Sequence, residues 1–420
     1  MLLEFSCSNH KSIKEKVTFS ALAGKDNTFE SSLKQFGDYR ILRTAVLYGA
    51  NGSGKSNFVN AFLFVRSLVI SSINLQPGQE IRQSVHKLSR PDSESEYCIQ
   101  FVKNGIRYAF GFVLKQHLIK SEYLYYFPLG RQVRIYERDE NTFYPGNKFK
   151  GKFEACKDVF KQNRLFLSCA ANFSNVVPVS EAYDFFLNDI VVYIASNSMN
   201  DASANWMQYS LRQIHDDPKV KKLVLSLLRL LNTGIKDVKI KIEERPLQMM
   251  ESAQTPSDEV KATLRTDFST QIDAKVIYDS FEVDLKREES LGIKKLFEML
   301  CPMIDILIHG KILVCDELES NLHEALVHGL IRLFCHLGSD QFAQLIFTTH
   351  DTTLLDLNLF RRDQIWFTEL TKDTRATELY SLAEIKNVRK DENIEKGYIC
   401  GKYGAIPMLN SELANFMAEL

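Results

Sequence analysis

The chain has 420 residues, of which 45% are hydrophobic and 25% are charged, and its formal net charge is −1. A chain of this length can bury a sizeable core, as one large domain or as a core domain with an inserted one. The near-neutral charge excludes a protein that is basic throughout, as general polyanion binders are, but it leaves room for local basic patches.

Eight cysteines are scattered along the chain, and none of them forms a Cys-x-x-Cys pair. Several lie in apolar runs such as "ILVCDE", which predicts reduced, buried thiols and not a disulfide framework or a zinc site. The N-terminal "MLLEFSCSNHKS" lacks the basic start and the long apolar stretch of a secretory signal. No uninterrupted apolar run approaches the roughly 20 residues of a membrane helix, so we expect a soluble cytoplasmic protein without a membrane partner.

The first part of the chain is rich in strand patterns. Residues 1–24 alternate loosely and are rich in Phe, Val and Leu, as strands are. Residues 44–72 predict a strand, a glycine loop and a helix. From about residue 97 to 145, short aromatic and β-branched runs are separated by turns such as "KNG", which predicts an antiparallel meander.

The remaining chain is helical at first and then alternates between helix and strand. Residues 150–232 have helical spacing, and residues 235–244 alternate as a strand does. No sustained heptad run occurs, which disfavours a long coiled coil. From residue 286 onward we expect a helix at 290–303, a strand at 311–315, a helix at 322–337, a strand at 343–348, a helix at 351–359 and a strand at 364–368.

A phosphate-binding loop is the most specific motif in the chain. The segment 49–56, "GANGSGKS", fits G-x-x-x-x-G-K-[ST] and lies between a predicted strand and a predicted helix. In this motif the backbone amides wrap the phosphates of ATP, the lysine contacts the β- and γ-phosphates, and the last hydroxyl ligates Mg²⁺. A chance glycine turn would rarely match every position in this context. We therefore expect nucleotide contacts from Asn51, Gly52, Ser53, Gly54, Lys55, Ser56 and Asn57, with Lys55 also acting in catalysis.

Two acids end an apolar strand in "KILVCDELESNLHE", which spans 311–324. Asp316 suits a direct or water-mediated contact to Mg²⁺, and Glu317 would face the γ-phosphate and polarise the attacking water. Taken alone, two acids at a strand end are often only solvated. The buried-type strand before them and the phosphate loop upstream favour the catalytic interpretation.

A histidine ends the next buried-type strand, "QLIFTTHD", at position 350. His350 would hydrogen-bond the γ-phosphate and sense its hydrolysis. A lone histidine is more often structural, and the position of His350 one strand after the paired acids is what favours a catalytic role.

These three pieces, in this order, resemble the ABC-type ATPases of the SMC, RecF and OLD group. The resemblance implies a D-loop at 319–323, in which Asn321 takes the usual aspartate position, and a signature motif in "REESLGIKKLFEML" at 287–300. Ser290 and Gly292 would open a helix there and donate to the γ-phosphate bound by the opposite subunit. An ordinary capped helix is the alternative, because Ser290 is also a good N-cap. ATP would then join two heads, so the resemblance implies a homodimer or a higher assembly of dimers.

Several stretches resemble one family more narrowly, namely the stand-alone ATPases of bacterial abortive-infection and anti-phage operons. This family covers the AbiL and RloA type, with the PARIS and Septu ATPases as relatives. The stretches are "FSCSNHKSIKEKVTFS", "ESLGIKKLF", "VCDELESNLHEAL", "QLIFTTHDTTLLD", "RRDQIWFTE" and "VRKDENIEKGYICGKYGAIP". The resemblance implies a separately encoded effector, such as a TOPRIM or HNH nuclease, which the ATPase holds or releases when a phage-derived trigger is sensed.

The distance between the motifs suggests three regions. The phosphate loop and the paired acids lie 260 positions apart, from Ser56 to Asp316, which exceeds what a minimal ABC head needs. We expect the first part of the ATPase head at 1–114, an inserted β and helical lobe at 115–232, and the second part of the head at 233–420. About 70 residues follow His350, too few for a TOPRIM nuclease domain, so we expect no nuclease site in this chain.

The predicted fold class is therefore α/β, an ABC-type P-loop NTPase head with a mixed sheet, an antiparallel β-meander and an inserted, mostly helical lobe. The predicted function is that of an ATPase subunit in anti-phage defence. Two alternatives remain open at this point, a DNA-repair clamp of the RecF or SMC type and a scaffold that binds ATP without hydrolysing it. Basic clusters at 146–153 and 217–223 could touch nucleic acid, although short charge runs are usually solvated.

Overall fold

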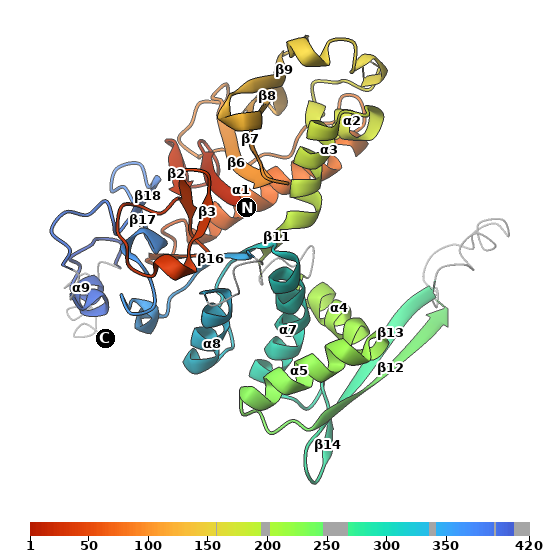
Figure 1. Ribbon diagram of the computed structural model, residues 1–420, viewed down its shortest axis with the longest axis vertical. Helices are drawn as coiled ribbons and strands as arrows, with labels where there is room; N and C mark the ends of the chain where they lie inside the picture. Colours follow the sequence, from red (N-terminus) through yellow and green to blue (C-terminus); the bar gives the residue numbers. More distant parts are fainter. Residues whose placement is uncertain (157, 195–201, 247–267, 336–341, 390–391, 407–420) are drawn as a thin grey trace, which may run out of the picture. The chain divides into compact units, whose positions relative to one another are not determined.

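The computed structural model describes residues 1–156, 158–194, 202–246, 268–335, 342–389 and 392–406 (Figure 1). The chain divides into two compact units. Unit 1 consists of Met1–Ile194, Ile306–Ser320 and Val327–Leu420, and unit 2 consists of Ala195–Asp305 and Asn321–Leu326.

An antiparallel sheet of seven strands, in the order β10-β9-β8-β7-β6-β1-β2, forms one layer of unit 1. Five of these strands are the predicted meander, in which each strand pairs with the next. The two N-terminal strands extend the same sheet, because β1 pairs with both β2 and β6. The bounds are β1 Leu2–Cys7, β2 Val17–Ser20, β6 Ser95–Lys103, β7 Ile106–Lys115, β8 Leu118–Phe127, β9 Val133–Asp139 and β10 Thr142–Pro145.

Because this sheet is continuous, the boundaries between the two units differ from the predicted domain boundaries. Strands β8 to β10 were expected in an inserted lobe at 115–232, but they hydrogen-bond through β7 and β6 to β1 and so belong to unit 1. Unit 2 begins at Ala195 and includes residues 233–305, which were expected in the ATPase head. The difference arises because strand pairing between distant parts of the chain decides which residues share a core.

A mixed sheet of six strands, in the order β11-β15-β16-β5-β17-β18, forms the second layer of unit 1. The first five strands are parallel, and β18 is an antiparallel edge. Parallel strands bring their carboxyl ends to one edge of the sheet, where loops can build a site. The bounds are β5 Thr44–Gly49, β11 Ile190–Tyr193, β15 Ile312–Cys315, β16 Gln344–Thr348, β17 Ile365–Leu370 and β18 Thr377–Ser381.

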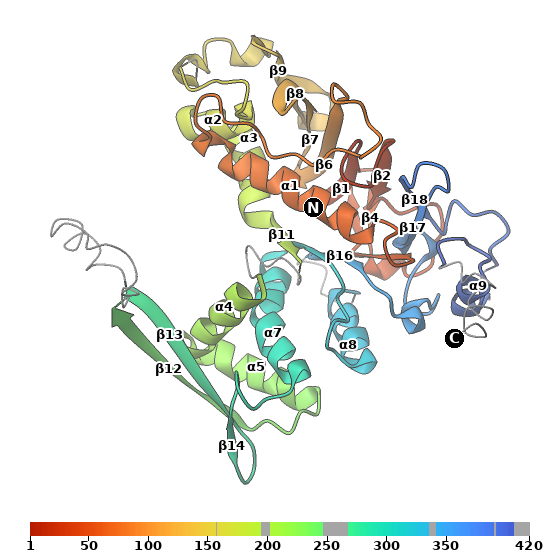
Figure 2. The same ribbon diagram turned by 180° about the vertical axis from the view of Figure 1, so that it is seen from behind.

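Helix α1 (Lys55–Ser71) packs between these two sheets (Figure 2). On one side, the ring of Phe62 stacks on that of Phe5 from β1, with centroids 3.8 Å apart. On the other side, α1 contacts β5, β11 and β15. By length and composition alone, the span Lys55–Asn74 would be long and apolar enough to cross a membrane. Burial between two sheets accounts for this apolar character, since seven apolar side chains of α1 lie in the core.

Two short helices, α2 (Phe166–Phe173) and α3 (Val177–Asp184), pack together and against the same core. The start of α2 is anchored by Glu122 of β8, which is buried. Its carboxylate accepts hydrogen bonds from the backbone N–H groups of Phe166 at 2.6 Å and Leu167 at 2.8 Å, and from the hydroxyl of Tyr136 at 2.7 Å. A negative charge at a helix N-terminus compensates for amides that have no partner within the helix.

Two predictions for unit 1 were wrong. The predicted helix at 351–359 is only a 3-10 turn, Thr352–Leu354, because the carboxylates of Asp351 and Asp356 each accept a hydrogen bond from the backbone two residues on. Strand β11, "IVVY", lies in a stretch predicted as helical, and four residues are too few to show a period of their own. The other elements are a hairpin of β3 Lys34–Phe36 and β4 Tyr39–Ile41, and the helices α8 Glu324–Cys335, which begins in unit 2, and α9 Ile394–Ile399.

Unit 2 combines helices with a three-stranded antiparallel sheet in the order β12-β13-β14 (Figure 1). The predicted strand at 235–244 is confirmed as β12, whereas β13 and β14 were not predicted. The elements are α4 Ala202–Asp216, α5 Pro218–Leu230, β12 Asp237–Pro246, β13 Phe268–Ile277, β14 Glu282–Asp284 and most of α7, which spans Leu291–His309. Their core contains Leu211, Val224, Leu228, Val276, Leu296, Phe297 and Leu300.

Candidate functional site

The predicted phosphate loop joins the end of β5 to the start of α1, as the motif requires. Gly52 and Gly54 have φ angles of +78° and +110°, a region that side chains with a Cβ adopt only under strain. A Cβ on Gly54 would also overlap the side chain of Thr377. Asn51, Gly52 and Ser56 are exposed. The loop thus turns its backbone outward over residues 51–52 and packs tightly at Gly54.

Hydroxyl groups from three segments that are distant in the sequence stabilise this loop through hydrogen bonds. The Ser53 hydroxyl hydrogen-bonds that of Thr368 on β17 at 2.6 Å. The Thr377 hydroxyl on β18 donates to the backbone oxygen of Ser53 at 2.8 Å. Because its proton is used there, Thr377 accepts from the Ser12 hydroxyl at 2.7 Å, and Ser12 accepts from the amide of Asn57 at 2.7 Å. Ser53 and Asn57 were predicted site residues, whereas their partners Thr368, Thr377 and Ser12 were not.

The side chain of Lys55, the first residue of α1, is buried within the phosphate loop. Its ammonium donates to the backbone oxygens of Gly49 at 2.7 Å and Ala50 at 3.3 Å. Burial lowers the pKa of Lys55 to about 8, although the nearby carboxylates of Asp316, Glu317 and Glu319 act in the opposite direction. Lys55 is therefore a desolvated cation near three acids. Its present acceptors are two neutral carbonyl groups, which the phosphate oxygens of a nucleotide could replace.

The two predicted acids lie at the carboxyl end of β15, next to the end of β16. In this register Cys315 pairs with Phe347, so the residues that follow them, Asp316 and Thr348, are neighbours. The Thr348 hydroxyl donates to Oδ1 of Asp316 at 2.6 Å and accepts from the backbone N–H of Glu317 at 2.8 Å. Asp316 is only 5% exposed, whereas Glu317 is exposed. Asp316 is therefore not merely a solvated acid at a strand end.

Glu317 has a left-handed backbone, with φ at +50°. Such a conformation is costly for a residue with a side chain and persists only where the surroundings enforce it. Here the enforcing contacts are the hydrogen bond from Glu317 N–H to Thr348 and the bond from Ser320 N–H to the backbone oxygen of Glu317 at 3.0 Å. The turn therefore presents the Glu317 carboxylate to solvent while Asp316 stays buried.

The predicted sensor His350 is exposed at the end of β16. Its backbone N–H donates to Oε1 of Glu319 at 2.6 Å. The second oxygen of Glu319, Oε2, is buried and has no hydrogen-bond partner among the described residues. Glu319 thus links the loop that follows the acids to the loop that carries His350. Glu319 lies in the predicted D-loop, but this role in joining the two loops was not predicted.

The remaining predicted residues, Ser290, Gly292 and Asn321, lie together in unit 2. The Ser290 hydroxyl accepts from the backbone N–H of Ile293 at 3.3 Å, which is the geometry of an N-cap. A Cβ on Gly292 would lie 3.2 Å from the backbone oxygen of Asn321. Ser290 and Asn321 are exposed, and Asn321 has φ at +62°. The start of α7 and the loop before α8 therefore form one exposed corner of unit 2.

The donor set fits a nucleotide with a hard cation. Mg²⁺ prefers oxygen ligands and usually retains water and phosphate oxygens, so a hydroxyl and a carboxylate such as those of Ser56 and Asp316 suffice from the protein. Within the described part of the chain, no group of three His, Cys, Asp or Glu residues could hold a metal ion by itself. The amides of the loop and the Lys55 cation are suited to phosphate.

Comparison with known proteins gives a family and a set of solved structures with low similarity to this chain. A family model described as "AAA domain, putative AbiEii toxin, Type IV TA system" matches residues 45–155 and 211–356, more than half of the chain. The matched residues include the phosphate loop, both acids and His350. No curated protein matches the chain.

Three solved structures are examples, and each match extends over 90% of this chain. The SMC head domain from Thermotoga maritima has 13% identity, a TM-score of 0.41 and 98% of its own chain covered. The SmcHead bound to the C-winged helix domain of ScpA has 12% identity, a TM-score of 0.40 and 97% covered. The Smc head domain with an extended coiled coil, bound to the C-terminal domain of ScpA derived from Pyrococcus furiosus, has 13% identity, a TM-score of 0.38 and 96% covered.

Proposed function

The chain belongs to the family described as "AAA domain, putative AbiEii toxin, Type IV TA system", and from this premise we propose that it is an ATP-hydrolysing P-loop ATPase of anti-phage defence. The observation that carries the ATPase part is the Thr348 hydroxyl, which joins Asp316 and the backbone of Glu317 beside the loop of Lys55. The defence part is supported by the family description and by the narrower resemblance to abortive-infection ATPases of the AbiL and RloA type.

In this mechanism the loop amides of residues 51–56 hold the phosphates, and Lys55 exchanges its two carbonyl acceptors for β- and γ-phosphate oxygens. Mg²⁺, held by Ser56 and Asp316, would supply charge neutralisation at the phosphates. The exposed carboxylate of Glu317 orients the attacking water and takes its proton. His350 contacts the γ-phosphate from the neighbouring loop, and Glu319 positions that loop by accepting its backbone N–H.

Two substitutions test hydrolysis separately from binding. Lys55→Ala should abolish binding of a fluorescent ATP analogue, because the loop loses its only side-chain cation. Glu317→Gln should bind with unchanged affinity and hydrolyse at least about 100-fold more slowly, since a positioned general base contributes roughly 10²–10⁴-fold. Normal turnover by Glu317→Gln would remove Glu317 from the mechanism. If the unaltered protein binds ATP without hydrolysing it, the chain is a scaffold that uses ATP as structural glue.

We further propose that ATP joins two heads, with Ser290 and Gly292 of one subunit contacting the nucleotide of the other, as in the ABC-type ATPases that the motifs resemble. The exposure of Ser290 is compatible with such a contact. The Glu317→Gln protein should elute as a dimer with ATP and as a smaller species with ADP in light-scattering chromatography. Ser290→Arg should abolish this shift. Ser226→Arg, at another exposed serine of unit 2, is the matched control and should leave it intact.

The biological role that we propose is a cytoplasmic scaffold that holds or releases a separately encoded effector, such as a TOPRIM or HNH nuclease. The test expresses the chain with its neighbouring gene and challenges the host with a panel of phages. Protection that is lost in Lys55→Ala supports the proposal. DNA-stimulated ATP hydrolysis without any protection, and without a neighbouring effector gene, would instead favour the DNA-repair clamp of the RecF or SMC type.

A further inference from the structure

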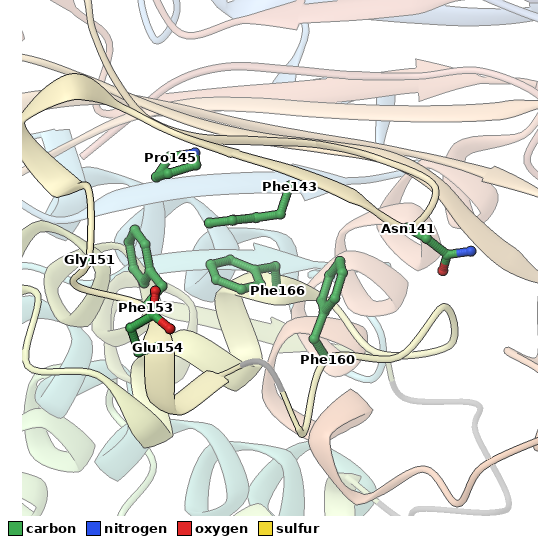
Figure 3. A pocket seen from close by; sticks show the side chains of 8 residues that line it. All are labelled: Asn141, Phe143, Pro145, Gly151, Phe153, Glu154, Phe160 and Phe166. Carbon is green, nitrogen blue, oxygen red and sulfur yellow. The ribbon is translucent and has the colours of Figure 1, made fainter.

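Four phenylalanine side chains line a cavity in unit 1, away from every residue of the phosphate site in sequence (Figure 3). Phe143 comes from β10, Phe153 and Phe160 from the loop that follows it, and Phe166 from the start of α2. The cavity has a volume of about 350 Å³, within the range of small-ligand pockets. Its lining consists of Asn141, Phe143, Pro145, Gly151, Phe153, Glu154, Phe160 and Phe166, and we call it the phenylalanine pocket.

Phe143 and Phe166 form one side of the pocket, and Phe153 and Phe160 stand at steep angles to them. Phe143 and Phe166 lie 4.2 Å apart between centroids and are inclined by 37°. Phe153 stands at 85° to Phe143, and Phe160 stands at 81° to Phe166. Phe153 and Phe166 are buried, whereas Phe143 and Phe160 are half-buried. A flat ring can therefore find both a face and an edge of phenylalanine in this pocket, the two arrangements that aromatic pairs prefer.

Three exposed lysines are close in sequence to residues that line the pocket. Lys148, Lys150 and Lys152 belong to the basic cluster at 146–153, which also provides Gly151 and Phe153 to the lining. Gly151 has φ at +75°, so the chain makes a tight turn between Lys150 and Lys152 at the pocket. Among the described residues, no carboxylate pairs with the ammonium group of any of the three. They differ in this from exposed lysines such as Lys16 and Lys275, which are paired with glutamates.

We propose that the phenylalanine pocket binds an unpaired base of a single-stranded nucleic acid, whose phosphates lie on Lys148, Lys150 and Lys152. Aromatic side chains beside a run of cations are the chemistry with which proteins hold single strands, because every base has a face to stack and every nucleotide carries a charge. The polar lining groups, Asn141 and Glu154, can accept from an N–H group of a base.

A single strand fits better than the two nearest alternatives. A base in a duplex is stacked on both sides, so it can enter a pocket only after it has been flipped out. An apolar side chain of a partner protein would use the rings but would leave three unpaired cations without a role. This inference concerns a site separate from the phosphate loop, and it holds or fails independently of ATP hydrolysis.

The test measures binding of fluorescein-labelled oligo(dT) and oligo(U) of about 16 nucleotides to the full chain by fluorescence anisotropy, with excess MgADP present to occupy the phosphate loop. The same DNA as a duplex, and AMP as a competitor, are the other probes. We expect the single strands to bind more tightly than the duplex. Phe160→Leu, which keeps an apolar side chain but removes one aromatic ring, should weaken single-strand binding by about fivefold or more.

A charge-reversal variant tests the lysines without touching the core. The triple variant Lys148→Glu, Lys150→Glu and Lys152→Glu should weaken binding and reduce the slope of log affinity against log salt by about 2, because each lost phosphate contact removes about 0.7. The matched control reverses three exposed lysines of unit 1 outside both basic clusters, Lys25, Lys87 and Lys386, with the same change in net charge. The control should retain the slope, and thermal melting should show that all variants are folded.

Three results would overturn the proposal. Equal affinity for the single strand and the duplex would exclude a base pocket. Unchanged binding by Phe160→Leu together with an unchanged salt slope in the lysine triple would show that nucleic acid binds elsewhere. Tight binding of AMP, with no gain from a longer strand, would identify a free nucleotide as the occupant and exclude the single strand.

Discussion

Replacing Thr348 with valine removes one hydroxyl and keeps the shape of a fully buried side chain. That hydroxyl donates to the Asp316 carboxylate at 2.6 Å and accepts from the Glu317 N–H at 2.8 Å. A hydrogen bond to a charged group contributes roughly 1.5–3 kcal/mol and a neutral one roughly 0.5–1.5 kcal/mol, so the free energy of unfolding should fall by about 2–4 kcal/mol. The same loss releases both acids from their positions, and kcat for ATP should fall about 10–100-fold, since each 1.4 kcal/mol is a factor of ten.

The assays are guanidinium unfolding and steady-state ATP hydrolysis, each with two comparison variants. Thr348→Ser keeps the hydroxyl and should restore most of the turnover. Thr349→Val removes a hydroxyl from the next residue, which is equally buried but accepts only from the backbone N–H of Asp351 at 3.0 Å. The reasoning is refuted if Thr348→Val and Thr349→Val have the same turnover, because the acids would then be held by something other than this hydroxyl.

Three further predictions follow from groups described above. Because burial lowers the pKa of Lys55 to about 8, ATP affinity should fall by up to about tenfold per pH unit above pH 8 as the ammonium is lost, and fluorescence titration would contradict this with a flat profile. Over the same interval the free protein should become more stable as pH rises, since the unfolded chain still binds that proton. Glu122→Leu should destabilise unit 1 by about 3–5 kcal/mol in denaturant unfolding, because it removes the carboxylate paired with the buried Arg138 and the acceptor of two helix amides, whereas Glu137→Leu, at a half-exposed ion pair, should cost under about 1 kcal/mol. Gly54→Ala should abolish nucleotide binding through its overlap with a threonine of β18, and Gly52→Ala, where a Cβ meets open space, should weaken binding only through backbone strain, as calorimetric titration of both would show.

The phosphate loop and the meander could be predicted from sequence because their information is local. A strand, a glycine loop and a helix occupy consecutive residues, and each strand of the meander pairs with its neighbour across a short turn. The positions of the two acids and of His350 after buried strands could also be predicted, since each follows an apolar run, whereas their roles remain a proposal. Strand β11 could not, because its four residues become a strand only by pairing with β15, more than a hundred positions later.

The sequence by itself determined which residues we propose for the chemistry of this site: the lysine, the two acids and the histidine each stand in a motif that contains its own context. Only the tertiary structure decided what holds them. Thr348 reaches Asp316 because two parallel strands share a register, and Thr377 lies against Gly54 because β18 closes the edge of the same sheet. These hydroxyl groups position the site only because of the atoms packed around them. Those atoms come from distant parts of the chain, so the neighbouring residues in the sequence do not reveal the role.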